Sequence, residues 1–138
     1  MLAERCEAAI TPSGDTAANL MLVAIGGPAG LTDFVRNVGD DAARLDRAEL
    51  DLNEARPGDP HDTTTPLAMA DTLHGFVLAD MPTPASGALL ADWLVGNRTG
   101  QGCLRAGPPK DGRVGDKTGS GENNVGNDVA VLWPPRPP

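Results

Sequence analysis

Apolar residues recur at helical spacing through most of residues 2–95. The segments 2–10 and 16–25 are predicted helices, and Asp15 is a candidate N-cap for the second. The apolar residues that share one face of the second helix are Leu20, Val23 and Ala24. The adjacent Gly26 and Gly27 should end this helix, because glycine disfavours continued helical backbone.

Three more helices are predicted before residue 96. Pro28 suits a first helical turn, and Gly39 ends the segment that follows it. The apolar stripe of that helix consists of Leu31, Phe34, Val35 and Val38. Thr65 and Pro66 begin the next helix. Its residues expected to face inward are Ala70, Leu73 and Val77. The last helix runs from Pro84 to Val95. Its apolar residues include Leu89, Leu90, Trp93 and Leu94.

The pattern changes character after residue 112. "RVGDKTG" and "NDVAVLW" are short runs typical of strands, and the turn-forming "SGENNVG" separates them. They are predicted to be adjacent antiparallel strands. Because two strands alone form a marginal sheet, we expect them to belong to a larger one.

One long segment has no apolar face. "RAELDLNEARPGDPHDTTTP", residues 47–66, combines charges of both signs with three prolines, while Leu50 and Leu52 alternate with carboxylates. Long structureless segments inside compact domains are uncommon and are often functional. The composition favours an Ω-shaped loop packed by its own side chains.

Composition narrows the choice of partners. The chain has 138 residues, enough for one domain, with 17 Gly, 13 Pro and only four aromatic residues (two Phe, two Trp, no Tyr). The formal net charge of −8 disfavours a duplex nucleic-acid partner, which requires a clustered basic surface. We expect no membrane span, because no apolar segment is long enough. We also expect no signal peptide in the sequence as given. Cys6 and Cys103 fit no metal spacing; they could pair, but buried free thiols are the simpler interpretation.

Three short motifs carry candidate chemistry. "ELDLN" places Glu49 and Asn53 four residues apart, where a carboxylate and an amide can share one water. "KTG" begins at Lys117 and puts an ammonium and a hydroxyl on a strand. "SGDTAAN" begins at Ser13, just ahead of a helix. Each motif alone is weak evidence, since most such matches are ordinary structure.

Together, in this order and spacing, the motifs resemble those of the class A serine β-lactamases. "SGDTAAN" is similar to the Ser-Asp-Asn box, "RLDRAELDLNEARPGDPHDTTTP" to the Ω loop, and "GDKTGSG" with "NDVAVLWPP" to the Lys-Thr-Gly strand and the strand after it. The resemblance implies an α/β (α+β) fold of the β-lactamase/transpeptidase type, present in part. Residues 1–138 would then be part of the catalytic domain: a helical part at 2–95 with the Ω loop at 44–62, and two sheet strands at 112–133.

The resemblance also implies roles in hydrolysis. Glu49 would be the general base that activates the deacylating water, and Asn53 would orient that water. Ser13 would relay a proton to the β-lactam nitrogen with electrostatic help from Lys117. Asn19 would support the loop from the neighbouring helix.

Further residues acquire expected roles in binding and loop support. Those expected to bind substrate are Asp15, Asn53, Thr118, Gly119 and Ser120, with the Ser120 N–H as an oxyanion-hole donor. The pair Arg47–Asp62 would close the loop, and Arg44 with Asp46 would add a second contact.

The sequence departs from the family pattern in two places. None of its serines (Ser13, Ser86 and Ser120) is followed by lysine three positions later, so the Ser-x-x-Lys nucleophile is not in the sequence as given, and we expect it upstream. The family's usual cysteine partner for Cys6 would lie there too. Gly14 and Asp15 stand where the resemblance implies Asp and Asn.

These observations support a primary interpretation and an alternative. The first is a β-lactam hydrolase that forms a serine acyl-enzyme and is deacylated through Glu49, with no metal or cofactor. The alternative is a non-catalytic remnant without turnover. A penicillin-binding peptidase is disfavoured by the Ω loop. The family implies a periplasmic or secreted location and a small-molecule β-lactam substrate. The exposed sheet edge could also support self-association.

Overall fold

The computed structural model describes residues 1–79 and 81–135. Its helices are α1 (Leu2–Ile10), α2 (Asp15–Ala24), α3 (Gly27–Asn37), α4 (Pro66–Val77) and α5 (Pro84–Val95). Two 3₁₀ turns, η1 (Asp51–Glu54) and η2 (Leu104–Ala106), and the strands β1 (Arg113–Ser120) and β2 (Gly126–Trp133) complete the elements. The five helices and both strands predicted from the sequence are therefore confirmed.

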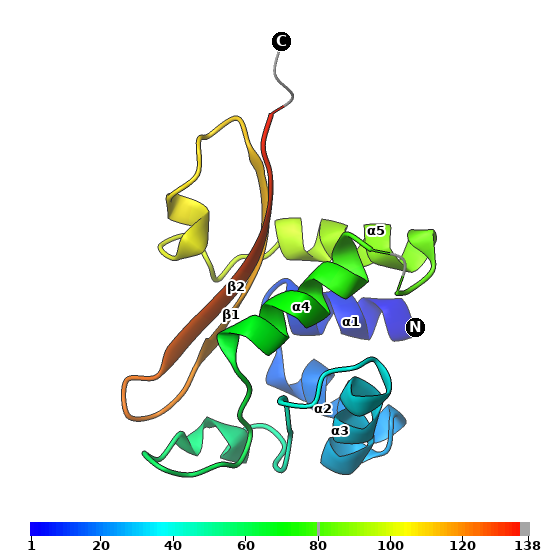
Figure 1. Cartoon of the computed structure of the whole chain (residues 1–138), viewed down its shortest axis with the longest axis vertical. Helices are drawn as coiled ribbons and strands as arrows, with labels where there is room; N and C mark the ends of the chain where they lie inside the picture. Colours follow the sequence, from blue (N-terminus) through cyan, green and yellow to red (C-terminus); the bar gives the residue numbers. More distant parts are fainter. Residues whose placement is uncertain (80, 136–138) are drawn as a thin grey trace.

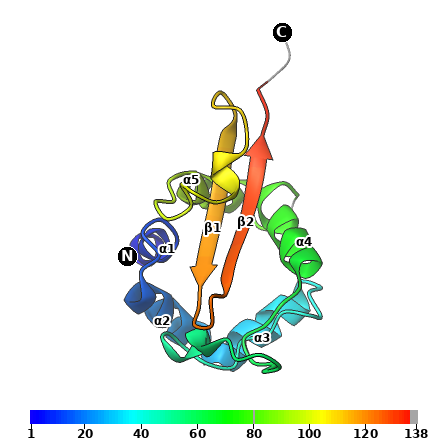
Figure 2. The ribbon, with the colours of Figure 1, turned by 90° about the vertical axis from the view of Figure 1, so that its left-hand side faces the viewer.

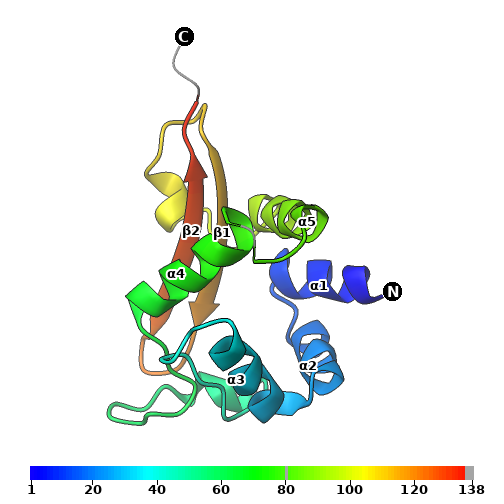
Figure 3. The same ribbon diagram turned by 45° about the vertical axis from the view of Figure 1, so that its right-hand side comes forward.

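The helices follow one another around the hairpin rather than forming a bundle. Contacts run from α3 to α2, from α2 to α1, from α1 to α5 and from α5 to α4. Figure 2 shows this arrangement with the hairpin in front and the helices around it. The hairpin packs on α5 through β1 and on α4 through β2, and α4 runs obliquely across it (Figures 1 and 3).

The two strands form an antiparallel hairpin of eight paired positions. Arg113 lies opposite Trp133 at one end, and Ser120 lies opposite Gly126 at the other. Alternation along the strands directs Gly115 toward α5, where an added Cβ would lie 3.0 Å from the Leu94 Cβ. The same alternation directs Lys117 to the face that carries the candidate chemistry.

The apolar core is small. Only Ala91 and Leu94 of α5, Val114 of β1 and Val131 of β2 are buried hydrophobic residues among those described. Val131 lies opposite Gly115, on the face that meets α5, whereas Val114 lies opposite Leu132 and is buried on the other face. The core at the junction of α5 with the hairpin therefore includes Val131 but not Val114. None of the residues in α1, α2 or α3 is classed as buried.

One expectation about an inward-facing residue was wrong, and one predicted apolar face is exposed. Leu20, Val23 and Ala24 are exposed, whereas the partly covered residues of α2 are Ala17, Ala18, Asn19, Met21 and Leu22. Because α2 is apolar on several sides, its pattern did not define a single packing face. Ala70 of α4 is also exposed rather than facing inward.

Helix starts follow ordinary capping chemistry with one correction. The Thr65 and Thr83 hydroxyls accept hydrogen bonds from backbone N–H groups in the first turns of α4 and α5. Asp15 is not an N-cap: Gly14 occupies that position, and Asp15 is the first residue of α2. An acidic residue there still interacts favourably with the helix dipole.

Among the described residues, no single helix has both the length and the apolarity to cross a membrane. The bent pair α2 and α3, with 72° between them, meets the length and composition criteria only when taken together.

Candidate functional site

A pocket of about 680 Å³ forms where the start of α2, the Ω loop and the hairpin meet. The predicted residues that line it are Ser13, Asp15, Glu49, Asn53, Lys117, Thr118, Gly119 and Ser120. The predicted loop-supporting residues Asn19, Arg47 and Asp62 lie outside its lining. The chain thus brings three distant motifs to one cavity.

Glu49 is held at both its backbone and its side chain. The Asn19 amide donates to the Glu49 carbonyl at 2.9 Å and accepts from the Glu49 N–H at 3.0 Å. The Asn53 Nδ2 donates to Glu49 Oε2 at 2.6 Å, and no side chain or backbone group of residues 1–79 and 81–135 hydrogen-bonds to Oε1. A carboxylate fixed in this way next to an amide can accept a proton from a water held between them.

Lys117 and Ser13 form the second polar contact in the pocket. Lys117 Nζ donates to Ser13 Oγ at 2.8 Å and to the Thr118 carbonyl at 2.6 Å. Burial lowers the pKa of Lys117 below its ordinary value, although the nearby Asp116 and Glu49 carboxylates act in the opposite direction. Ser13 itself has φ 58°, in the left-handed region that non-glycine residues occupy at some energetic cost.

The hairpin turn is attached directly to the Ω loop. The Glu122 N–H donates to the Asn53 carbonyl at 2.7 Å, and Asn123 Nδ2 donates to the Glu54 carbonyl at 3.0 Å. Asn123 and Asn124 have φ 55° and 59°, a conformation that asparagine tolerates in turns. These contacts fix the distance between the Glu49–Asn53 pair and the end of β1.

The neck of the Ω loop is closed by reciprocal contacts between two aspartates. The N–H of Asp46 donates to Asp62 Oδ1 at 2.7 Å, and the N–H of Asp62 donates to Asp46 Oδ2 at 3.0 Å. Arg44 Nε adds a bond of 2.8 Å to Asp46, and the Arg44 N–H donates to the Thr63 carbonyl at 2.9 Å. The expected contact between Arg44 and Asp46 is therefore present.

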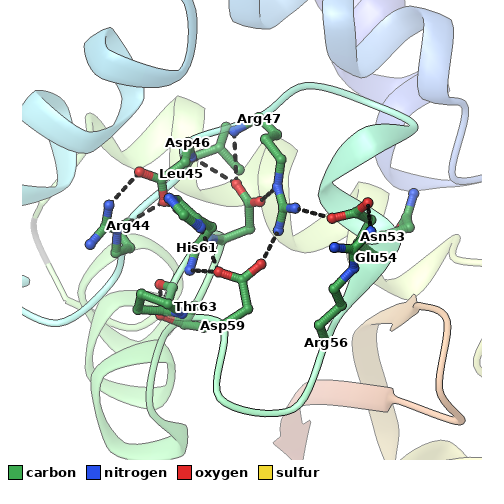
Figure 4. Close-up of polar contacts among 12 residues, drawn as sticks. Arg44, Leu45, Asp46, Arg47, Asn53, Glu54, Arg56, Asp59, His61 and Thr63 are labelled. Carbon is green, nitrogen blue, oxygen red and sulfur yellow. Dashed lines mark hydrogen bonds and ion pairs between the residues drawn. The ribbon is translucent and has the colours of Figure 1, made fainter.

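Arg47 lies at the centre of the loop and contacts three carboxylates. Its Nε donates to Asp62 at 2.5 Å, Nη1 to Glu54 at 2.7 Å and Nη2 to Asp59 at 3.2 Å. Figure 4 shows the guanidinium between Glu54 and Asp59. The expected pair with Asp62 is thus one part of a larger network, in which a single guanidinium serves three carboxylates.

The network also shifts the ionisation of its carboxylates. The guanidinium of Arg44 hydrogen-bonds to Asp46 and lowers its pKa to about 2, with help from the Asp62 N–H. Burial acts to raise the pKa of Asp62, but hydrogen bonds from the Asp46 and Arg47 backbones and the Arg47 side chain outweigh it, so the pKa lies below its ordinary value. Both groups are consequently anionic across the neutral range.

Two structural anchors near the site were not anticipated from the sequence. Asp116, fully buried beside Lys117, accepts from Asn97 at 2.9 Å and from Arg105 Nε at 2.7 Å. Arg105 also donates to the carbonyls of Leu94 and Val95 at 3.0 Å, and so ties β1 to the end of α5. No sequence periodicity connects Asn97, Arg105 and Asp116. The one sequence signal for this anchor is that Asp116 is an acidic residue inside a predicted strand.

The second anchor lies at the start of the Ω loop. Asp40 is buried, and its Oδ1 accepts from the N–H groups of Ala42 and Ala43 at 2.9 and 2.8 Å. Thr72 of α4 donates to Oδ2 at 3.1 Å. The Ala43 N–H bond is the main reason that the pKa of Asp40 lies below its ordinary value.

The cysteines differ from the sequence-based interpretation. Both are free thiols, and Cys103 is exposed at the pocket lining rather than buried. It directly precedes η2. Within residues 1–79 and 81–135, no group of three or more His, Cys, Asp or Glu side chains is placed to hold a metal ion.

The substrate-binding residues expected on the strand are only partly free. Thr118 Oγ1 lies 2.5 Å from Thr99 Oγ1, so its hydroxyl already has a partner. Ser120 is exposed, and an added Cβ at Gly119 would meet nothing within 4 Å. The end of β1 therefore leaves open space beside the backbone.

Comparison with known proteins gives one consistent result. The family model described as "Beta-lactamase enzyme family" matches residues 1–138. "Beta-lactamase L2" of Stenotrophomonas maltophilia is 53% identical over 129 residues, covering 94% of this chain and 43% of that protein. "Beta-lactamase FAR-1" of Nocardia farcinica is 51% identical over 132 residues, covering 96% of this chain and 42% of that protein.

Solved structures show the same arrangement of elements. "Ancestral (GNCA) Beta-lactamase class A" superposes with a TM-score of 0.96 at 61% identity, over 98% of this chain and 52% of that one. The "last common ancestor of Gram-negative bacteria (GNCA4) beta-lactamase class A" gives a TM-score of 0.95 at 60% identity, over 97% and 51%. The chain thus spans about half, or slightly less, of the length of the proteins it matches.

Proposed function

This chain belongs to the beta-lactamase enzyme family, and from that membership we propose that it supplies the deacylating half of a β-lactam hydrolase site. The observation that carries the proposal is the geometry of Glu49: an amide on each side, 2.6 Å to Asn53 and 2.9 Å to Asn19, holds it at the edge of the pocket. Residues 1–138 would form part of the catalytic domain, in the two parts expected from the sequence.

In the proposed reaction, a serine ester of the opened β-lactam is hydrolysed by water. Glu49 accepts a proton from that water as the water attacks the ester carbonyl, and Asn53 fixes its position. The ester C–O bond then breaks, and the serine oxygen receives the proton that Glu49 had accepted, which regenerates both the serine hydroxyl and the Glu49 carboxylate. The Ser120 N–H is proposed to donate to the developing oxyanion, which is the interaction that gains most strength in the transition state.

The other half of the pocket suits ring opening and recognition. Lys117, hydrogen-bonded to Ser13 at 2.8 Å, favours proton relay through the Ser13 hydroxyl to the lactam nitrogen as the C–N bond breaks. We propose that Thr118, Gly119 and Ser120 bind the substrate carboxylate beside the Lys117 ammonium. Asp15 would face the acyl side chain as an anion. The substrate is a small β-lactam, encountered in the periplasm or outside the cell.

The alternative, a polypeptide without turnover, is favoured by one specific observation. Formation of the ester requires a serine with a lysine one helical turn away, and none of the three serines of this sequence has that neighbour. The 138-residue polypeptide alone should therefore not hydrolyse β-lactams. Loss of the nucleophile in comparable serine hydrolases lowers turnover roughly a millionfold.

The test supplies the missing nucleophile. The 138-residue chain is mixed with a polypeptide that carries the Ser-x-x-Lys half of the ancestral GNCA enzyme, and hydrolysis of a chromogenic cephalosporin is measured. We expect turnover by the mixture only. With Glu49→Ala, we expect a covalent adduct to accumulate on the serine-bearing polypeptide, visible in its intact mass, because deacylation lacks its base.

Asp51→Ala is the matched control. It removes a carboxylate two residues from Glu49, in η1, that does not line the pocket. This variant should turn over like the parent mixture. Steady hydrolysis by the Glu49→Ala mixture, without adduct, would overturn the assignment of the general base. Hydrolysis by the 138-residue chain alone would overturn the division of the site between two segments.

A further inference from the structure

The pocket between α2, the Ω loop and the hairpin has two sides of different charge. The residues that line the side formed by the start of α2 and the Ω loop are Ser13, Asp15, Glu49, Leu52 and Asn53. The other side is formed by the hairpin and residues 99–103, and it carries Lys117 and Asp128. Lys117 is the only basic side chain among the described residues that line the pocket. The α2 and Ω-loop side therefore presents two carboxylates and no cation.

The Lys117 ammonium is already engaged by other groups. Its Nζ donates to Ser13 Oγ at 2.8 Å and to the Thr118 carbonyl at 2.6 Å. Burial lowers the pKa of Lys117, and of the four carboxylates that oppose this effect Asp116 acts most strongly and Asp15 least. The negative charge of Asp15 is therefore the one that Lys117 compensates least.

Asp15 has no partner of its own. It is the first residue of α2, its side chain is exposed, and it makes no hydrogen bond or ion pair with residues 1–79 and 81–135. Glu49, the other carboxylate on this side of the pocket, already accepts from Asn53 at 2.6 Å. Asp15 is thus a free negative charge at a place that a ligand in the pocket can reach.

The proposed placement of the substrate decides which of its ends lies near Asp15. The substrate carboxylate would lie on the hairpin side, beside Lys117, and the reacting carbonyl would lie between the Ser120 N–H and the water held by Glu49. The acyl side chain is attached to the lactam ring away from the carboxylate, so it would extend along the α2 and Ω-loop side. A pocket of about 680 Å³ has room for such a ligand, because ligand pockets commonly measure about 300–1,000 Å³.

We propose that Asp15 makes the site selective for β-lactams whose acyl side chain carries a positive charge. This inference rests on the proposed function and adds the substrate class to it. An ammonium on the side chain is attracted by Asp15, whereas a carboxylate in the same place is repelled by Asp15 and by Glu49. A neutral side chain gains nothing from either charge.

The size and kind of the effect follow from the exposure of Asp15. Ion pairs that are open to water change an equilibrium constant by about two- to fivefold. The charged group of the substrate lies away from the reacting atoms, so its attraction is equal in the ground state and the transition state. Such an interaction lowers KM and leaves kcat unchanged. The preference should also fade between 0.1 M and 1 M salt, as the screening length shortens from about 10 Å to about 3 Å.

Two penicillins that differ by one amino group provide the test. One has a phenylacetyl side chain, and the other has its α-amino derivative, which is protonated at pH 6. Their hydrolysis is measured with the mixture of the 138-residue chain and the polypeptide that carries Ser-x-x-Lys. We expect the ratio of the two KM values to favour the amino compound, and Asp15→Asn to reduce that preference about two- to fivefold without a change in the ratio of the kcat values.

Two further variants complete the kinetic series. Asp15→Glu keeps the negative charge and should keep the preference. Asp51→Asn removes the same charge from an exposed residue of η1 that does not line the pocket, and it should behave like the parent. Equal KM ratios for the parent and Asp15→Asn would overturn the inference. Loss of the preference in Asp51→Asn would overturn it too, because the general field of the chain would then be its cause.

A binding measurement separates this inference from the proposed function. Each penicillin is titrated into the 138-residue chain alone, and the NMR shifts of the Thr16 and Ser120 amides give its Kd. A mixture that hydrolyses neither penicillin refutes the proposed function. In that case, tighter binding of the amino compound that Asp15→Asn abolishes still supports the selectivity of the pocket, whereas equal affinities or no binding overturn it.

Discussion

Three replacements of Asp62 separate what charge, hydrogen bonding and backbone shape each contribute to the neck of the Ω loop. The Asp62 side chain is only 4% exposed and accepts three bonds: from the N–H groups of Asp46 and Arg47 and from Arg47 Nε. Its backbone has φ 56°, in the left-handed region. The substitutions Asp62→Asn, Asp62→Gly and Asp62→Ala remove the negative charge, the hydrogen-bond acceptors and the tolerance of positive φ in different combinations.

The expected costs follow from the contacts. Asp62→Asn keeps an oxygen for the two N–H groups and tolerates positive φ, but it places an amide against Arg47, so it should cost about 1.5–3 kcal/mol, the worth of a charged hydrogen bond. Asp62→Gly keeps the backbone shape but removes every acceptor, for about 3–5 kcal/mol as in a broken buried pair. Asp62→Ala adds the left-handed penalty of about 1–2 kcal/mol to that.

Hydrogen exchange of the Asp46 and Arg47 amides reports this local opening directly, because both amides donate to the side chain being changed. Protection should fall in the order parent, Asn, Gly, Ala. Limited proteolysis between Glu49 and Asp59 should follow the same order, with Ala48→Gly cut like the parent. Equal protection in the three variants would refute both the pairing and the role of the positive φ.

Three further predictions rest on other parts of the structure. The folded pKa of Asp46 is about 2, below the unfolded value of about 3.9, so its contribution to stability is complete above pH 4 and is lost as pH falls toward 2. The hydrogen-exchange protection of the Ω-loop amides should decline over that window, and unchanged protection at pH 2.5 would contradict the prediction. An NMR titration should place the pKa of Lys117 below the ordinary lysine value, and Asp15→Asn should lower this pKa further by removing a negative charge. A higher Lys117 pKa in the Asp15→Asn variant would refute the influence of Asp15. Gly100→Ala would place a Cβ 1.6 Å from the buried carboxylate of β1 and should destabilise the chain by about 1–3 kcal/mol in urea unfolding. Gly102→Ala, whose Cβ would meet nothing within 4 Å, should be nearly neutral, and equal urea midpoints for the two variants would show that the carboxylate can move aside.

Local signals predicted the elements well. The threonine–proline pairs before α4 and α5, and Gly39 after α3, mark element boundaries through side-chain capping and backbone freedom, which act over a few residues. The hairpin was equally accessible, because its turn contains Asn123 and Asn124, both of which adopt positive φ. These features depend only on neighbours in sequence.

Packing faces and the polar anchors could not be predicted in this way. The packing face of α2 does not follow from its pattern, because the exposed Leu20 and Val23 are as apolar as the partly covered Leu22. Asp116, Arg105 and Asn97 meet across 19 residues of chain, so no local pattern records their bond. The site motifs were recognisable from resemblance, but the single cavity that joins them is a property of the folded chain.

The close approach of α1 to the start of α2 limits which residues can occupy position 14. The Gly14 N–H donates to the Ala8 carbonyl at 3.0 Å, and a Cβ at position 14 would lie 2.9 Å from that same oxygen. An aspartate at position 14 would therefore bring its Cβ against backbone, not against a side chain that can rotate. The spacing of these two helices therefore sets a size limit at position 14, where a residue larger than glycine fits only if α1 and the start of α2 move apart.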